Sequence, residues 1–131
     1  MAKPRRNYNS RTIVDIWRRW RYRNAMDLET AAKCLAELGN PTRLAAYQLL
    51  VKAGPTGLSV GEIQDQLQIP KSTLSHHIAH LLWAGLITQV RDGRTQRCAA
   101  VYETMDALMA FLSKECCSGV RSSARRQRAG K

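Results

Sequence analysis

Four cysteines are the side chains best suited to chemistry in this chain of 131 residues: Cys34, Cys98, Cys116 and Cys117. They are too few and too scattered for a disulfide scaffold, so we expect a reducing compartment and thiols free for metal, metalloid or redox chemistry. Cys116 and Cys117 are adjacent. Consecutive Cα atoms stand about 3.8 Å apart, which is below the usual disulfide range. The pair therefore suits a small bridging centre better than a disulfide.

Three histidines, His76, His77 and His80, raise a second metal hypothesis, because residues four apart share one face of a helix. The pattern superficially resembles a zinc-protease box, but His77 stands where that box needs its catalytic Glu. Neither a nucleophile–base pairing nor a second group of zinc ligands accompanies it. We therefore expect no enzyme, and we interpret His77 as a partly buried, hydrogen-bonded residue.

The net charge of +11 lies in the two ends of the chain. Residues 1–26 hold eight Lys and Arg against one acidic residue, and residues 118–131 hold five against none, whereas residues 27–117 are nearly neutral. We predict one folded domain over 27–117, between a basic N-terminal extension over 1–26 and a basic disordered tail over 118–131. Such basicity favours an acidic partner, usually nucleic acid, although the tails could equally be solvated arms.

The N-terminus lacks the continuous apolar segment of a secretory signal, and no apolar run is long enough to span a bilayer. We therefore expect a cytoplasmic protein without a membrane partner. In the extension, the spacing of Ile13, Ile16, Trp17 and Trp20 predicts a short amphipathic helix. Packing of that helix on the domain or on a dimer partner is favoured over a role at a membrane surface.

Apolar spacing predicts helices over residues 28–38, 41–53, 59–67 and 71–84. The first three begin at capping residues: Asp27, Asn40 before Pro41, and a Ser59–Glu62 capping box. On the first helix we expect one apolar stripe, made of Leu28, Ala31, Ala32, Leu35 and Leu38. The third and fourth helices flank a brief break at residues 68–70, which indicates a helix-turn-helix.

The hydrophobic period then changes. Residues 86–91 and 96–102 alternate as strands do, and Asp92-Gly93 between them predicts a hairpin turn. A last helix is expected to start near Thr104 and to carry one apolar stripe, formed by Met105, Leu108, Met109, Leu112 and Cys116. The predicted fold class is mainly α with a small β-hairpin, arranged as a winged helix-turn-helix.

This arrangement predicts binding to double-stranded DNA, with the second helix of the helix-turn-helix in a major groove. Its outward side offers short polar and basic side chains suited to base edges and phosphates, namely Lys71, Ser72, Thr73, Ser75 and His76. Near the hairpin tip, Arg91, Arg94 and Arg97 can reach backbone phosphate or the adjacent minor groove.

The segments LGNPTRLAAYQLLV, GLSVGEIQDQL, PKSTLSHHIAHLLWAGLI and RDGRTQRCAA closely resemble the ArsR/SmtB family of metalloregulatory repressors. The resemblance covers roughly residues 28–117. It implies a homodimeric winged-helix protein whose first and last core helices form the dimer interface. It also implies a repressor that leaves its operator when an inducer binds, without a required cofactor.

The inducer sites of the family can be compared with this chain position by position. Arsenite-sensing members carry a Cys-Val-Cys in the first helix of the helix-turn-helix, where this chain has residues 61–65 without cysteine. Zinc-sensing members use Asp and His in the last helix, which here contains Asp106 and Glu115 but no His. Cys116 and Cys117 remain. The chain most resembles the branch that responds to trivalent methylarsenicals, in which the terminal pair is joined by a wing-strand cysteine that maps onto Cys98.

Trivalent arsenic is soft and prefers thiolate sulfur. Inorganic arsenite has three exchangeable positions, whereas methylarsenite has two. Ser123 stands where related sites can have a third cysteine. A pair of cysteines therefore favours methylarsenite as inducer, with arsenite or antimonite as alternatives if Cys98 or Cys34 supplies a third sulfur.

Two other hypotheses stay open. In one, the chain is a redox-sensing repressor in which Cys98 forms a disulfide with Cys116 or Cys117. In the other, it is an architectural DNA-binding protein with incidental cysteines. Packing roles also compete: Cys116 could be an interface hydrophobe, Cys98 is as readily a packing residue as a ligand, and Cys34 is better explained by packing.

Overall fold

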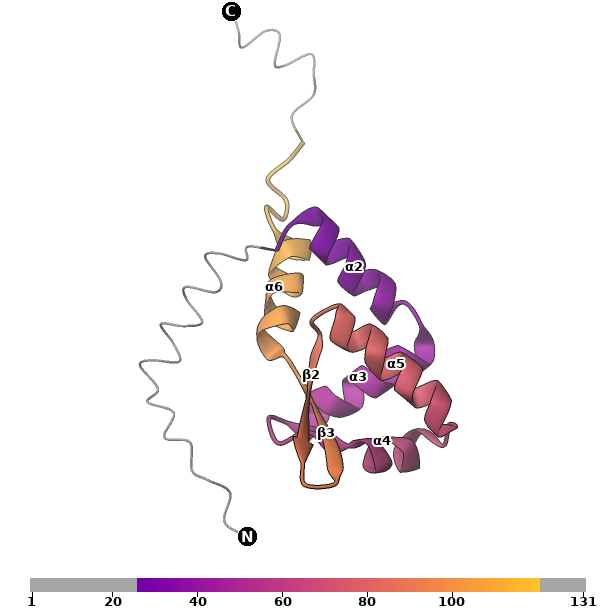
Figure 1. Cartoon of the computed structure of the whole chain (residues 1–131). Coiled ribbons are helices and arrows are strands. Elements are labelled where there is room, and N and C mark those ends of the chain that lie inside the picture. Colours follow the sequence, from indigo (N-terminus) through magenta and orange to yellow (C-terminus); the bar gives the residue numbers. More distant parts are fainter. Residues whose placement is uncertain (1–25, 121–131) are drawn as a thin grey trace, which may run out of the picture.

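A computed structural model describes residues 26–120, and these residues contain five helices and three strands. The helices are α2 (Leu28–Leu38), α3 (Pro41–Ala53), α4 (Val60–Leu67), α5 (Lys71–Trp83) and α6 (Tyr102–Ser113). The strands are β1 (Leu58–Ser59), β2 (Ile87–Asp92) and β3 (Thr95–Ala100). Figure 1 shows α2 and α6 together at one end of the domain and the β2–β3 hairpin extending towards the other. The predicted winged helix-turn-helix is confirmed.

The predicted helix starts are confirmed by their hydrogen bonds. The Asp27 carboxylate accepts from the backbone N–H of Thr30 at 2.7 Å, and the Asn40 side chain accepts from that of Arg43 at 3.0 Å. At the start of α4, Ser59 Oγ accepts from Glu62 N–H at 3.1 Å, while the Glu62 carboxylate accepts from Ser59 N–H at 2.7 Å. These contacts satisfy N–H groups that have no partner inside the helix.

The sheet has the antiparallel order β1-β3-β2, so the predicted hairpin gains a third strand. Asp92 pairs with Thr95, which makes Gly93 and Arg94 the two loop residues. Strand β1 was not predicted, because its two residues are too few to show a period. It is preceded by Gly57 at φ +66°, where an added Cβ would lie 1.9 Å from the backbone oxygen of Cys98. Only glycine allows β1 to approach β3 this closely.

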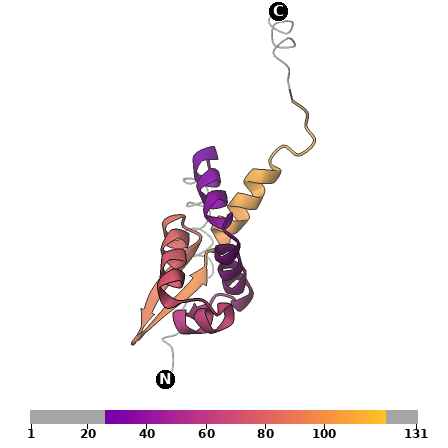
Figure 2. The same cartoon turned by 90° about the vertical axis from the view of Figure 1, so that its right-hand side faces the viewer.

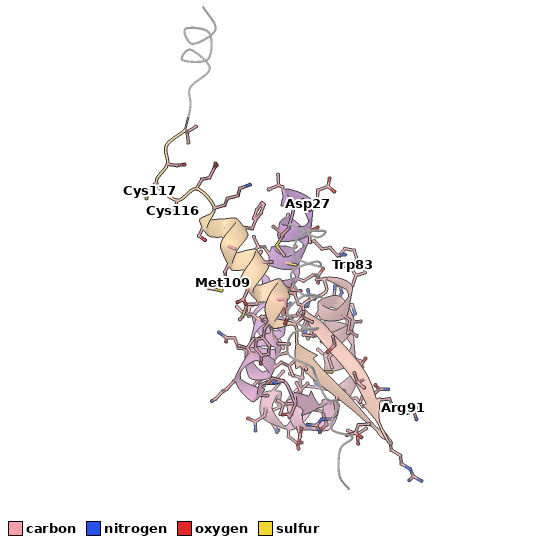
Figure 3. All side chains as sticks on the ribbon, turned by 90° about the vertical axis from the view of Figure 1, so that its left-hand side faces the viewer. Asp27, Trp83, Arg91, Met109, Cys116 and Cys117 are labelled. Atoms are coloured by element: carbon pink, nitrogen blue, oxygen red, sulfur yellow. The ribbon has the colours of Figure 1, made fainter. Side chains whose placement is uncertain are left out.

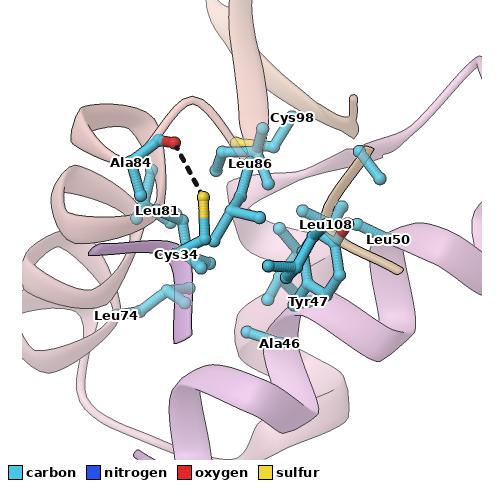
Figure 4. Packing of buried hydrophobic residues seen from close by; sticks show 14 of the residues in the cluster. Cys34, Ala46, Tyr47, Leu50, Leu74, Leu81, Ala84, Leu86, Cys98 and Leu108 are labelled. Atoms are coloured by element: carbon cyan, nitrogen blue, oxygen red, sulfur yellow. Dashed lines mark hydrogen bonds between the residues drawn. The ribbon is translucent and has the colours of Figure 1, made fainter. Parts of the chain in front are cut away.

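The hydrophobic core lies between the helices and the inner face of the sheet. Its fully buried side chains include Cys34, Leu50, Ile63, Leu74 and Leu86, and Leu108 of α6 closes it beside Tyr47. Figure 4 shows Cys34, Leu50, Leu74 and Leu108 converging from α2, α3, α5 and α6. The hairpin of β2 and β3 projects beyond this core, as the turned view in Figure 2 shows.

The buried side of α2 and the extent of α6 differ from the apolar stripes expected from the sequence. On α2, Ala31 and Cys34 are buried, whereas Leu28 and Leu35 are 72% and 43% exposed. Helix α6 begins at Tyr102, two residues earlier than expected, and ends at Ser113, before the cysteines. The Ser113 hydroxyl donates to the carbonyl of Met109 at 2.9 Å, and Lys114 has ψ 129°, outside the helical range.

The amphipathic segment predicted within residues 1–26 and most of the predicted tail lie outside the described residues. Within residues 26–120, we find no helix with the length and apolarity needed to cross a membrane.

Candidate DNA-binding face and thiol site

Helices α4 and α5 form the helix-turn-helix around a three-residue turn. Gln68 ends α4 in the left-handed conformation, with φ 53° and its N–H donating to the carbonyl of Gln64. Pro70 then sets the extended geometry from which α5 begins. Leu74, Ile78 and Leu81 anchor α5 to the core. This anchoring fixes which side of α5 faces solvent.

The five predicted DNA-contacting residues of α5 are all exposed: Lys71, Ser72, Thr73, Ser75 and His76. No side chain caps the start of this helix, so its first N–H groups donate to no capping side chain. Exposed N–H groups at a helix N-terminus favour an anionic partner such as phosphate. The face therefore combines hydrogen-bonding side chains with an electropositive helix start.

The three predicted arginines of the wing have different surroundings. Arg94 lies in the hairpin loop and is exposed. Arg91 is exposed near the tip, where its Nε donates to the carbonyl of Gly93 at 3.2 Å (Figure 3). Arg97 instead donates to the carbonyls of Thr56 and Gly57 at 3.3 and 3.1 Å. Arg97 therefore holds the loop before β1 against the wing.

A charged network that the sequence did not predict connects α2 and α3 to α5. The guanidinium of buried Arg43 donates to the Glu37 carboxylate at 2.6 Å, and its Nε donates to His77 Nδ1 at 3.4 Å. The same Glu37 oxygen lies 2.8 Å from Nδ1 of His80, whose Nε2 lies 3.1 Å from that of His76. Spacing along α5 pointed to the histidines, but nothing local pointed to Glu37, because the contact spans the fold.

His77 is buried, as expected. Burial, followed by the nearby positive charge of Arg43, lowers the pKa of its imidazole from the ordinary value of 6.5. Acceptance of a hydrogen bond from Arg43 at Nδ1 also requires that nitrogen to be unprotonated. His77 is therefore a neutral structural residue.

Cys116 and Cys117 lie in exposed turns beyond α6, with their Sγ atoms 3.4 Å apart (Figure 3). Glu115 and Cys117 both have positive φ, at 57° and 64°. This irregular backbone turns the adjacent thiols towards each other, which a continuous helix could not do because neighbouring side chains diverge by about 100°.

Cys98 and Cys34 are fully buried. Cys98 lies on β3 between Leu58 and Gln89, and Cys34 donates from Sγ to the carbonyl of Ala84 at 3.5 Å (Figure 4). Burial raises the pKa of both thiols. The fold thus brings Cys116 and Cys117 together but not Cys98 with them. Across residues 26–120, no three or more His, Cys, Asp and Glu side chains are grouped to hold a metal ion.

Comparisons with known proteins agree with this architecture. A family model described as a helix-turn-helix domain matches residues 38–90, from the end of α2 through the helix-turn-helix into β2. An uncharacterized HTH-type transcriptional regulator of Methanocaldococcus jannaschii is 37% identical over 65 residues, which are 50% of this chain and 71% of that protein. A putative arsenical resistance operon repressor of Halobacterium salinarum is 34% identical over 89 residues, which are 66% of this chain and 65% of that protein.

Among solved structures, that of the ArsR family transcriptional regulator RHA00566 superposes with a TM-score of 0.59 at 27% identity. The match covers 69% of this chain and 90% of that one. By sequence, the chain therefore belongs to the HTH-type transcriptional regulators, and its fold matches that of a solved ArsR family regulator.

Proposed function

We propose that this regulator is a homodimeric repressor that leaves its operator when a trivalent arsenical binds Cys116 and Cys117, with methylarsenite preferred. The observation that carries the proposal is the 3.4 Å separation of two exposed Sγ atoms. Thiolate sulfur binds a metal centre at about 2.3 Å, so two sulfurs at roughly a right angle around one small centre lie about 3.3 Å apart. The pair is therefore already arranged for chelation.

The number of available thiols supports methylarsenite over arsenite. Methylarsenite carries one carbon and two hydroxyl groups on arsenic, so two thiols displace both hydroxyls as water and complete the centre. Cys98 would be the third sulfur for arsenite, but it is fully buried on β3 and its pKa is raised by burial. We assign Cys98 a packing role. Similarity to a protein named as a putative arsenical resistance operon repressor also favours an arsenical inducer.

The proposed DNA contacts are those of α5 and the wing. Lys71, Ser72, Thr73, Ser75 and His76 would enter a major groove, and Arg91 and Arg94 would contact backbone or minor groove. Arg97 would act by holding the wing in place rather than by contacting phosphate.

The proposed dimer interface uses the apolar side chains that one protomer leaves uncovered on α2 and α6. Leu28, Leu35, Met109 and Leu112 are 72%, 43%, 61% and 59% exposed. Because Cys116 and Cys117 lie in the turns just after α6, binding of one arsenic atom to both would change how the chain leaves that interface helix. A small change there would alter the spacing of the two recognition helices, on which binding to two half-sites depends.

The test is release of a fluorescent duplex taken from the DNA upstream of the gene, followed by fluorescence anisotropy. We expect methylarsenite to release the wild-type protein at lower concentration than arsenite or antimonite. Cys116→Ser and Cys117→Ser should bind the duplex normally and no longer respond. Ser118→Ala, an exposed neighbour, is the matched control. Normal release of either cysteine variant by arsenicals would disprove the proposed sensor.

The exposed, adjacent thiols also support a second candidate, a redox-sensing repressor. Peroxide would accept two electrons and become water. Two thiols, either from one protomer or from two protomers, would lose their hydrogens and join in a disulfide. Release by peroxide but not by arsenicals, lost in Cys116→Ser and reversed by dithiothreitol, would favour this function. The buried position of Cys98 makes it a poor partner for such a disulfide within one chain.

A further inference from the structure

The side chains of His76 and His80 meet on the solvent side of α5, away from the thiol pair. Their Nε2 atoms lie 3.1 Å apart, on successive turns of a helix whose opposite side is anchored in the core. They line an open pocket of about 370 Å³ together with Glu37, Ala79 and Trp83. We propose that this pair binds a divalent transition-metal ion of the kind that imidazole prefers, such as Zn²⁺.

The protonation of His80 supports ligation. Its Nδ1 lies 2.8 Å from the Glu37 carboxylate, which can only accept a hydrogen bond, so Nδ1 carries the proton. In a neutral imidazole the lone pair is then on Nε2, the atom that faces His76. A histidine ligand that donates its other ring N–H to a carboxylate is the usual outer arrangement of a metal site.

Glu37 is itself held in place. The oxygen that accepts from His80 also accepts from Arg43 at 2.6 Å, and Arg43 is a buried residue of α3 that also donates to His77. Arg43 also donates to the backbone carbonyl of Glu37 at 3.2 Å. The carboxylate that orients His80 is therefore fixed by the fold rather than by a mobile surface contact. Glu37 is a positioning residue and not a ligand in this site.

The nitrogen separation fits one shared ion. Zinc binds imidazole nitrogen at about 2.0–2.1 Å, so two nitrogens 3.1 Å apart would subtend roughly 100° at the ion. His76 would carry its proton on Nδ1 while Nε2 binds. Since no three such ligands converge within residues 26–120, water would fill the remaining positions in the open pocket. The site would be weaker than one with three or four protein ligands.

Occupancy of this site would compete with DNA. This consequence, unlike the site itself, depends on the proposed DNA-binding function, because it requires His76 to be on the face that enters the groove. An ion shared with His80 would hold the His76 ring towards the next helical turn. Binding of zinc and of DNA would then each weaken the other by the same factor.

The test is titration of the full chain with Zn²⁺, in a Cys116→Ser/Cys117→Ser background that removes the exposed thiols. Long-range ¹H–¹⁵N spectra of the histidine rings report which nitrogens bind. We expect one zinc per protomer and shifts at Nε2 of His76 and His80, with no shift at His77. His76→Ala and His80→Ala should abolish saturable binding. Glu37→Gln should weaken it about tenfold or more, with Glu29→Gln as the matched control on α2.

Unchanged zinc affinity in both histidine variants, or ring spectra that do not respond to zinc, would overturn the site. If Glu37→Gln unfolds the chain, the two alanine variants still decide, because both histidines are at the surface. A duplex bound equally well with and without zinc would overturn the competition. Failure to bind any duplex without zinc would instead count against the proposed function, while the spectra of the free protein would still settle the site.

Discussion

Cys98 and Cys116 are the same residue type in opposite surroundings. The first is fully buried on the central strand, and burial raises the pKa of its thiol, whereas the second is exposed next to a second thiol. Since the thiolate is the form that binds metals and metalloids, exposure decides which cysteines are available for chemistry. The same contrast separates His77, buried and neutral, from its exposed neighbour His76.

Substitution of Cys98 tests its packing role. We expect Cys98→Ser to lower the free energy of unfolding by about 1–3 kcal/mol, because the serine hydroxyl would be buried without a hydrogen-bond partner. Cys98→Ala should lower the free energy of unfolding by less than about 3 kcal/mol. It should also keep the response to methylarsenite. Urea denaturation and the duplex-release assay measure the two effects. A folded Cys98→Ala protein that no longer responds would show that Cys98 is a third ligand.

The neutral His77 predicts a pH dependence of stability. Its folded-state pKa lies below the ordinary value of 6.5, so the unfolded chain binds the additional proton first as pH falls. The stability that His77 contributes is therefore complete above pH of about 6.5 and is lost as pH falls towards the folded-state pKa. Thermal melting of the wild type and His77→Gln should diverge above that pH and converge below it. A difference that grows on acidification would contradict this assignment.

At the scale of elements, the position of the recognition helix α5 depends on the contacts that hold α4 and the wing. Helix α4 is held at its start by the reciprocal Ser59–Glu62 contacts, and α5 is anchored by its buried side. The wing is held at its base by Arg97, which donates to the loop before β1. These local contacts set the positions of the surfaces proposed to touch DNA.

Loss of the α4 cap should be measurable. Ser59→Ala removes the hydroxyl that accepts from Glu62 N–H, and we expect it to lower the free energy of unfolding by about 1 kcal/mol. Gln66→Ala, at an exposed position within α4, is the control and should have little effect. Chemical denaturation monitored by circular dichroism measures both variants. Equal stability of Ser59→Ala and the wild type would show that the cap contributes nothing net.

The wing arginines should separate into two classes. Arg94→Ala should weaken duplex binding and reduce the slope of log affinity against log salt by about one, without a change in stability. Arg97→Ala should also lower the melting temperature, because it releases the carbonyls of Thr56 and Gly57. Anisotropy titrations at several salt concentrations, with parallel melts, distinguish them. Identical behaviour of the two variants would contradict the structural role of Arg97.

At the scale of the whole molecule, the proposed function uses two ends of the domain. The wing extends from one end, while α2, α6 and the thiol pair lie at the other (Figures 1 and 3). An inducer bound at the thiols is therefore proposed to act through the subunit arrangement rather than by blocking the DNA-binding face. This makes the oligomeric state part of the proposed mechanism.

A charge placed on α6 should separate the proposed dimer. Leu112→Glu puts a carboxylate at a side chain that is 59% exposed in one protomer and that the dimer would cover. We expect a monomer by sedimentation and much weaker duplex binding, because an unpaired buried charge is strongly unfavourable. Val90→Glu, at an exposed apolar residue on the wing, is the matched control and should leave the mass unchanged. A dimeric Leu112→Glu protein would place the interface elsewhere.

Sequence alone determined the features that depend on neighbouring residues. Helix starts at Asp27, Asn40 and Ser59, the order of the elements and the hairpin after α5 follow from caps, hydrophobic period and turn residues. These signals act within a few positions of the chain. They were sufficient to predict the winged helix-turn-helix and the exposed face of α5.

Tertiary structure decided what depends on contacts between distant segments. Strand β1 exists because Gly57 lets two residues approach β3, and Cys98 is buried because that strand becomes the centre of the sheet. Glu37 meets His80 and Arg43 meets His77 only when α2, α3 and α5 pack together. The exit of the chain from α6, which aligns Cys116 with Cys117, likewise depends on backbone angles that no periodic pattern encodes. The contacts of β1 with β3, of Glu37 with His80 and of Arg43 with His77 join groups far apart in sequence, so residue spacing carries no record of them.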